Sequence, residues 1–377
     1  MNQKLKVVFN ATSLRPGGGL TVLLGVLQGL KHQQDLDLEA IVICGAQASA
    51  DAVKAQGVAS EVILKCKDQG MWRRQWFVTM SLGSLVNQLD ADLFFSVNQF
   101  VRNVACPQVV YHLNLLRFLP IDRSRGLVHG IAEWLRNRSA KQAIQKADAN
   151  VFESNYLLQC ATEAYGVPHG PAEVIYIGLP DELIDQLAED TPSDVCSSTL
   201  MAITNHNEHK DNPTLIRVLR ALVEKHPEVD WRMKIAGSIF PEKWQPFKEL
   251  ASELGVASRI DWLGFVSQEE LTDHLKDSLC LVSTSRIESF CMVALESMAR
   301  GCPAVVANAS SMPESVGDAA VLVSPGDHNE FAEAIATFYA EPTVRADFVE
   351  FGFERIETFR WERCGREFAE LLRRLKK

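Results

Sequence analysis

Short runs of apolar, mostly β-branched residues alternate along the whole chain with longer segments whose apolar residues recur at helical spacing. One series of short runs lies at 6–10, 38–44, 92–97, 108–112, 150–154 and 172–177. A second series lies at 200–204, 231–237, 260–264, 279–283, 303–307 and 320–324. Strands that alternate with helices are typical of βαβ units, in which helices connect parallel strands. The sequence therefore predicts an α/β protein with two doubly wound sheets, one after the other.

A segment without a strand pattern separates the two series. Residues 178–198 are acidic and include two prolines, a composition expected of a linker. We therefore predict a first domain at 1–177, a linker at 178–198 and a second domain at 199–358, with a last helix at 359–377. A chain of 377 residues is long enough for two hydrophobic cores.

Charge and composition exclude several classes of protein. The formal net charge of -10 argues against a nucleic-acid partner, because binding to phosphates needs clustered Lys and Arg. The nine cysteines include no CxxC pair, so we expect neither a disulfide framework nor a zinc knuckle.

The N-terminus lacks the apolar core of a signal peptide. The longest uncharged stretch, 75–89, has 15 residues, whereas a membrane span needs about 20. We expect a cytoplasmic protein without a transmembrane segment.

A glycine-rich loop follows the first predicted strand. Ligands of open α/β sheets bind beyond the carboxyl ends of the strands, so such loops are the places to look for function. Gly17, Gly18 and Gly19 precede an apolar helix, and glycines there let the backbone approach a phosphate group. The dinucleotide fingerprint GxGxxG is incomplete, because Val22 occupies its last position. A turn with a helix cap is the alternative interpretation.

Two acidic residues mark the segment RIESFCMVALESMARGCPAVVA at 286–307. Glu288 lies in a loop after a predicted strand, and Glu296 lies eight residues later, in the first turns of a predicted helix. A carboxylate can accept hydrogen bonds from two hydroxyls, which is the chemistry needed to hold a ribose diol or a hexose. The alternative, that acids near a helix N-terminus complement the helix dipole, accounts for a single Glu but less well for the pair. We expect both to face the crevice between the domains.

The spacing of Glu288 and Glu296, followed by the small-residue run GCPAVVA, resembles the nucleotide-sugar signature of retaining GT-B glycosyltransferases, in particular glycosyltransferase family 4 (glycosyl transferases group 1). Three further segments resemble this family, at 150–168, 203–219 and 260–271. The resemblance implies two Rossmann-like domains that face a central cleft. It also implies that the helix at 359–377 packs back on the first domain.

The resemblance also implies roles for individual residues. Glu296 would hold the ribose, Glu288 the donor sugar, and Lys210 the donor diphosphate. The glycine loop would approach phosphate, and His112 would point at the donor sugar or the reaction centre. The backbone N–H groups of four consecutive residues would approach the sugar and phosphate: Ser289, Phe290, Cys291 and Met292. In isolation, Lys210 could instead be a solvated surface lysine, and His112 a strand-end histidine satisfied by its neighbours.

Two residues depart from the family pattern. Asn205 stands where many relatives have an Arg, five residues before the Lys that binds diphosphate. We expect Asn205, or His206, Asn207 or His209 beside it, to donate hydrogen bonds in place of that cation. Cys291 stands where relatives commonly have Gly.

The segment 102–146 carries eight basic and two acidic residues, a local charge of +6. Together with Trp72, Trp76 and Phe77, this charge predicts a protein surface that contacts a membrane at the interface between lipid headgroups and water. A solvated helix face is the alternative. We expect no metal site, because Asp90 and Asp92 precede a strand, at the edge of the sheet away from the crevice.

The resemblance thus implies a metal-independent retaining glycosyltransferase that moves a hexose from a nucleotide-sugar, with UDP-sugar favoured and GDP-sugar next. The acceptor would be a glycan or a lipid-linked molecule in bacterial surface polysaccharide or lipopolysaccharide biosynthesis, at the inner face of the membrane. A nucleotide-sugar epimerase or phosphorylase of the same fold is one alternative, and a non-catalytic donor-binding subunit is another.

Overall fold

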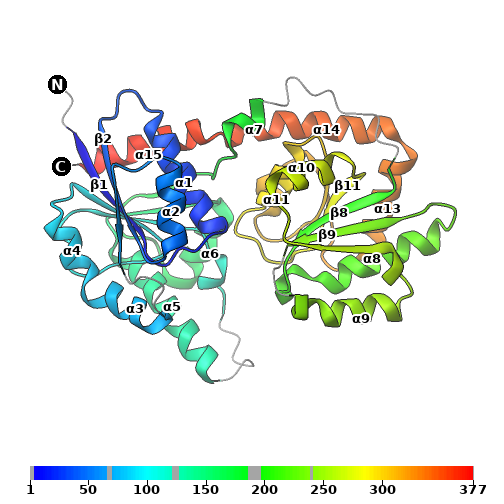
Figure 1. The fold of residues 1–377 in the computed structure, drawn as a ribbon, viewed down its shortest axis with the longest axis horizontal. Helices are drawn as coiled ribbons and strands as arrows, with labels where there is room; N and C mark the ends of the chain where they lie inside the picture. Colours follow the sequence, from blue (N-terminus) through cyan, green and yellow to red (C-terminus); the bar gives the residue numbers. More distant parts are fainter. Residues whose placement is uncertain (1–3, 66–69, 121–126, 186–196, 238–240, 377) are drawn as a thin grey trace. The chain divides into compact units, whose positions relative to one another are not determined.

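The computed structural model describes residues 4–65, 70–120, 127–185, 197–237 and 241–376, drawn as a ribbon in Figure 1. The chain forms two compact units. Unit 1 comprises Met1–Pro180 and Phe359–Lys377, and unit 2 comprises Asp181–Thr358. Of the linker predicted at 178–198, residues 186–196 lie outside the described residues, and Asp181–Asp185 form the short helix α7 of unit 2.

Unit 1 contains a parallel sheet. Its strands are β1 (Leu5–Ala11), β2 (Leu38–Cys44), β3 (Glu61–Leu64), β4 (Leu93–Val97), β5 (Gln108–His112), β6 (Ala149–Phe152) and β7 (Ala172–Val174). The strand order is β3-β2-β1-β4-β5-β6-β7, and each neighbouring pair is parallel. The order reverses direction between β1 and β4, which is where ligands of doubly wound sheets bind. The edge strand β3 was absent from the predicted series.

Unit 2 contains a second parallel sheet, as predicted. Its strands are β8 (Thr199–Thr204), β9 (Arg232–Gly237), β10 (Ile260–Gly264), β11 (Cys280–Ser283), β12 (Ala304–Ala307) and β13 (Ala320–Val323). The strand order is β10-β9-β8-β11-β12-β13. The switch point lies between β8 and β11, which pair in parallel, so the loops that follow these two strands are neighbours.

Helices connect the strands in both units (Figure 1). Those of unit 1 are α1 (Gly18–Lys31), α2 (Gln47–Ala55), α3 (Met71–Met80), α4 (Leu82–Gln88), α5 (Leu127–Lys146), α6 (Asn155–Tyr165) and α15 (Trp361–Leu375). Those of unit 2, after α7, are α8 (Asn212–Lys225), α9 (Gln245–Glu253), α10 (Gln268–Lys276), α11 (Met292–Met298), α12 (Met312–Val316), α13 (His328–Ala340) and α14 (Pro342–Ile356). The α/β prediction is confirmed.

The last helix, α15, packs on α1 in unit 1, where the red and blue ribbons of Figure 1 lie together. Glycines let the two backbones meet, because a Cβ atom built on Gly365 would lie 2.0 Å from the carbonyl carbon of Gly29. The ring of Phe368 packs edge-on against Phe95 and Tyr111, with centroids 5.4 and 5.1 Å apart. The C-terminal helix is therefore part of the core of unit 1.

No helix within the described ranges is long and apolar enough to span a membrane.

Candidate functional site

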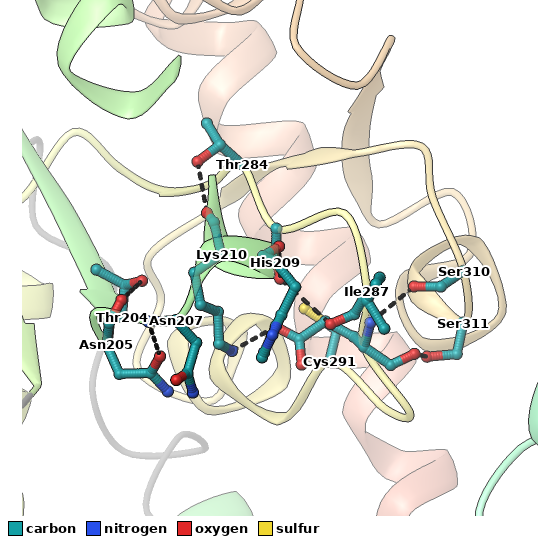
Figure 2. A network of polar contacts seen from close by, with 12 residues as sticks. Thr204, Asn205, Asn207, His209, Lys210, Thr284, Ile287, Cys291, Ser310 and Ser311 are labelled. Carbon is teal, nitrogen blue, oxygen red and sulfur yellow. Dashed lines mark hydrogen bonds and ion pairs between the residues drawn. The ribbon is translucent and has the colours of Figure 1, made fainter. Parts of the chain in front are cut away.

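The two predicted site residues Lys210 and Glu288 meet in unit 2. Lys210 lies at the end of the loop after β8, and Glu288 lies in the loop after β11. The Nζ atom of Lys210 lies 2.5 Å from Oε1 of Glu288, and the two side chains are only 16% and 15% exposed. Figure 2 shows this network, with Lys210 reaching toward the loop that contains Ile287 and Cys291. Partial burial strengthens the attraction relative to an exposed pair.

Serines that follow β12 hold the Glu288 loop in place. The hydroxyl of Ser310 accepts a hydrogen bond from the backbone N–H of Glu288 at 2.9 Å. Ser311 donates to the Glu288 carbonyl at 2.8 Å (Figure 2). The backbone of Glu288 is therefore fixed from both sides, which restricts where its carboxylate can lie.

Two of the four backbone N–H groups predicted to approach a donor are engaged within the protein. Cys291 donates its N–H to the Ser315 hydroxyl at 3.1 Å, and Met292 donates to the Phe290 carbonyl at 3.1 Å. These contacts differ from the prediction that all four N–H groups face the ligand. The cause is that Cys291 is buried at the start of α11, where its N–H faces α12.

Glu296 lies in α11, and burial raises the pKa of its carboxyl group, an effect that Arg300 opposes. No hydrogen bond or ion pair to this carboxylate is found among the residues that the structure describes. Arg300 itself binds α10, through Thr272 at 2.9 Å and Gln268 at 2.9 Å. The side chain of Glu296 is half-buried, so its carboxylate is suited to accept hydroxyls from a ligand.

Asn205 shapes the loop after β8. Its Oδ1 accepts the N–H of Asn207 at 2.9 Å (Figure 2). Its carbonyl accepts a hydrogen bond from Asn212 Nδ2 at 2.7 Å. These bonds use the acceptors of Asn205 and leave its Nδ2 donor unused by the described part of the chain. That donor is the group that could replace the missing Arg.

The glycine loop lies in unit 1, at the carboxyl end of β1. Gly17 is the residue before α1 and has φ 137°, a backbone conformation that other residues rarely adopt. A Cβ atom on Gly17 or Gly18 would meet no other atom within 4 Å, whereas one on Gly19 would lie 3.3 Å from Leu14 Cδ2. Both Gly17 and Gly18 are exposed, so the loop leaves backbone open to a ligand.

His112 ends β5 and is completely buried in unit 1. Its Nε2 lies 2.9 Å from Oδ1 of Asn150, and its ring stacks on Phe152 with centroids 4.8 Å apart. Burial lowers the pKa of His112 to about 4, so the ring is neutral at physiological pH. Its Nδ1 has no partner among the described residues. The interpretation as a satisfied strand-end histidine therefore fits Nε2 but leaves Nδ1 without a hydrogen bond.

The predicted membrane surface is smaller than the charge count indicates. Arg136, Arg138 and Lys141 are exposed on α5, and Arg138 lies over the ring of Trp134, 5.5 Å from its centroid. Arg117 was counted with them, but its guanidinium is buried and donates to the Asn98 carbonyl. Arg123 and Arg125 lie outside the described residues.

The predicted aromatic cluster on α3 is also only partly exposed. Trp76 is 64% exposed, but Phe77 packs against the core, because it faces the sheet side of the helix. The side chain of Trp72 lies outside the described residues.

Two further charged residues of this site were missed in the sequence. Asp211 follows Lys210 directly, and its Oδ2 lies 2.7 Å from Nε of Arg286. Both residues lie in loops after strands, which is the signal that could have identified them. Within the described ranges, no group of three or more His, Cys, Asp or Glu side chains is arranged to hold a metal ion.

Comparisons with known proteins identify relatives of this chain. Residues 188–355 match the family model "Glycosyl transferases group 1". A D-inositol 3-phosphate glycosyltransferase of Corynebacterium urealyticum is 27% identical over 166 residues, which are 43% of this chain and 39% of that protein. The match thus spans about two fifths of the length of that relative.

Solved structures of glycosyltransferases share the fold across nearly the whole chain. Anabaena HepE in complex with UDP and glucose has a TM-score of 0.71 at 18% identity, over 98% of this chain and 99% of that one. WaaG, a glycosyltransferase involved in lipopolysaccharide biosynthesis, has a TM-score of 0.73 at 12% identity, over 97% and 99%. Residues 188–355 of this chain are thus similar to the glycosyl transferases group 1 family, and the architecture of the chain is the GT-B fold.

Proposed function

We propose that this protein is a retaining glycosyltransferase that transfers a hexose from a nucleotide-sugar. The observation that carries the proposal is the close pair of Lys210 and Glu288, held at the switch point of the sheet in unit 2. Glu296, a half-buried carboxylate with no hydrogen bond or ion pair in the described chain, follows in the next helix. One cation and two carboxylates suit a ligand that combines a diphosphate with two sets of sugar hydroxyls.

In this proposal each charged group has one role. Glu296 accepts the ribose hydroxyls, and Glu288 accepts hydroxyls of the donor sugar. The bond between the sugar C1 and the diphosphate oxygen breaks, and the diphosphate departs with the bonding electrons. Lys210 donates to the departing oxygen and stabilises the charge that develops there. The acceptor hydroxyl forms the new bond from the same face of the sugar and gives its proton to the departing diphosphate, which retains the configuration.

We further propose UDP-sugar as the favoured donor, with GDP-sugar next. Binding of UDP by the similarly folded HepE supports this choice. The decisive test is a thermal-shift panel of UDP-, GDP- and ADP-sugars, because a ligand at 100 times its Kd stabilises a protein by about 2.7 kcal/mol. Radiolabelled transfer to acceptor in a membrane extract follows, with and without EDTA. A strict requirement for a divalent ion would contradict metal-independent transfer.

The same assays separate the alternatives. An epimerase would convert the donor without an acceptor, and a phosphorylase would turn over with inorganic phosphate. A non-catalytic subunit would bind the nucleotide and transfer nothing in any extract that contains acceptor.

For the acceptor, we propose a glycan or lipid-linked molecule of bacterial surface polysaccharide biosynthesis, reached at the cytoplasmic face of the membrane. The exposed Arg136, Arg138 and Lys141 on α5, with Trp134 beside them, support contact with an anionic lipid surface. Lipopolysaccharide is one such product, and WaaG, with the same fold, acts in its synthesis.

A further inference from the structure

The loops after β8 and β11 are joined by contacts that lie beside the Lys210–Glu288 pair. The hydroxyl of Thr284 donates to the carbonyl of Lys210 at 3.2 Å (Figure 2). It also donates to the carbonyl of Asp211 at 3.0 Å. The backbone N–H of Arg286 donates to the His209 carbonyl at 2.7 Å. The backbone on both sides of Lys210 is therefore tied to the loop that contains Glu288.

Asp211 is the residue on which these contacts depend. Its φ of 48° lies in the left-handed region, which Asp and Asn tolerate better than other side chains. Its carboxylate is 11% exposed, accepts the Thr214 hydroxyl at 2.9 Å and pairs with Arg286 at 2.7 Å. The side-chain contacts of Asp211 thus hold the backbone turn that directs Lys210.

The charge of Asp211 would oppose the proposed function if it were left alone. A carboxylate next in sequence to Lys210, and mostly shielded from water, repels a bound diphosphate. Arg286 compensates that charge through its Nε, although its own side chain is 55% exposed. With Arg286 in place, the charges of Asp211 and Arg286 sum to zero, so this pair adds no net negative charge beside Lys210.

We propose that Asp211 and Arg286 form a positioning pair that fixes Lys210 against Glu288 and keeps the site free of an uncompensated negative charge. The proposal rests on the proposed function, because the ligand whose diphosphate Lys210 meets is the nucleotide-sugar. Relatives with an Arg five residues before the Lys have two cations for the diphosphate. Here Asn205 supplies no charge, so binding of the diphosphate depends more on where Lys210 lies. Neither Asp211 nor Arg286 is assigned a contact with the substrate.

The test compares Arg286→Gln, Asp211→Asn and the double variant, for affinity to the nucleoside diphosphate and for kcat. Arg286→Gln leaves the Asp211 carboxylate uncompensated, so we expect Kd to rise about tenfold. The double variant removes both charges and should return Kd to within about threefold of the wild type. Its kcat should stay low, because the turn that directs Lys210 is no longer held. Binding of the nucleoside without phosphates should be unchanged.

Two further variants serve as controls for this test. Arg286→Lys keeps the charge and should keep Kd near the wild-type value, which gives a readout even where Arg286→Gln does not fold. The matched control is Arg259→Gln, which breaks the Asp230–Arg259 pair of 2.8 Å in the same unit, away from this loop. We expect no change in its Kd or kcat.

A double variant that binds no better than Arg286→Gln overturns the electrostatic role. Unchanged Kd and kcat in Arg286→Gln overturn the positioning pair as a whole, while wild-type binding and transfer leave the proposed function intact. Wild-type protein that binds no nucleoside diphosphate refutes the proposed function itself, so the two failures are distinct.

Discussion

The Nζ atom of Lys210 lies 2.5 Å from Oε1 of Glu288, although 78 residues separate them in the chain. In the ligand-free protein the two charges neutralise each other. A diphosphate that approaches Lys210 competes with Glu288 for its ammonium group, while a sugar hydroxyl can hydrogen-bond to the carboxylate. Under the proposed function, donor binding would therefore exchange one ion pair for two contacts, one from each residue.

Lys210→Ala should lower kcat by about 100-fold and weaken donor binding much less, because the ammonium stabilises charge that develops in the transition state. Glu288→Gln should leave the affinity for free nucleoside diphosphate near the wild-type value and reduce sugar-dependent turnover. Steady-state kinetics and calorimetric titration measure both quantities. Lys225→Ala is the matched control, since Lys225 forms an exposed pair with Glu333 at 3.0 Å. Equal losses in kcat for both lysines would refute the role of Lys210.

The Glu296 carboxylate should lower the stability of the ligand-free protein at neutral pH, although it contributes to nucleotide binding. Burial raises its pKa above the ordinary value of 4.5, so the stability that this group contributes is present below that pH and is lost as pH rises through the folded-state pKa. At pH 7 without ligand, Glu296→Gln should therefore increase the free energy of unfolding, and the gain should shrink toward zero near pH 4. Urea denaturation at both pH values measures this difference.

The same substitution series tests the ribose contact. Glu296→Ala should weaken nucleotide binding by about 1.5 to 3 kcal/mol, the size of lost hydrogen bonds to a charged group. Glu350→Gln, on an exposed face of α14, is the control for both experiments. Stability that changes equally for Glu296→Gln and Glu350→Gln at every pH would contradict this account.

His112 should make the stability of the protein depend on pH between about 6.5 and 4. The unfolded chain binds a proton on this ring below pH 6.5, whereas burial lowers the folded-state pKa to about 4. The free energy of unfolding should therefore decrease as the pH is lowered across that window. The decrease should be about 3 kcal/mol, at 1.36 kcal/mol per pH unit. His112→Gln should remove this slope, whatever its effect at pH 7. His32→Gln, an exposed position, should retain it, and a slope that persists in His112→Gln would be evidence against the burial argument.

Much of the fold is predictable because buried parallel strands leave a continuous apolar signal. The run at 108–112 has every residue buried in β5, and both sheets were recognisable from such runs. The edge strand β3, at Glu61–Leu64, was missed because it has four residues and none is fully buried, so its pattern is weak.

The site was less accessible to sequence reasoning. Lys210 and Glu288 were brought together through a family resemblance, because their contact depends on β8 and β11 being neighbours, and strand order is not encoded in local spacing. The Asp211–Arg286 pair spans 75 residues and was missed for the same reason. Counting charges also placed Arg117 on the surface, although its guanidinium is buried.

Gly365→Ala should destabilise unit 1, because the added Cβ would lie 2.0 Å from the backbone of Gly29 and force α15 away from α1. We expect a loss of about 1 to 3 kcal/mol, typical of an overpacked contact. Urea denaturation measures it. Gly70→Ala is the control, since a Cβ there meets no atom within 4 Å and needs no unusual backbone angle. A Gly365→Ala protein as stable as the wild type would show that α15 does not need this close approach.

The surface on α5 should bind anionic lipid weakly and reversibly. Each basic residue near such a membrane contributes about 1 kcal/mol, so Arg136, Arg138 and Lys141 together contribute about 3 kcal/mol. Salt should weaken the binding, because exposed charges are screened within about 10 Å at 0.1 M.

Co-sedimentation with vesicles, with and without anionic lipid, compares the wild type with the variant in which these three residues are changed to Glu. The control reverses three exposed basic residues of unit 2, Arg217, Lys243 and Lys248, which alters the net charge equally. If only the α5 variant is released from anionic vesicles, the α5 surface binds lipid specifically. Equal release of both variants would show that binding depends only on net charge, and would favour a soluble acceptor.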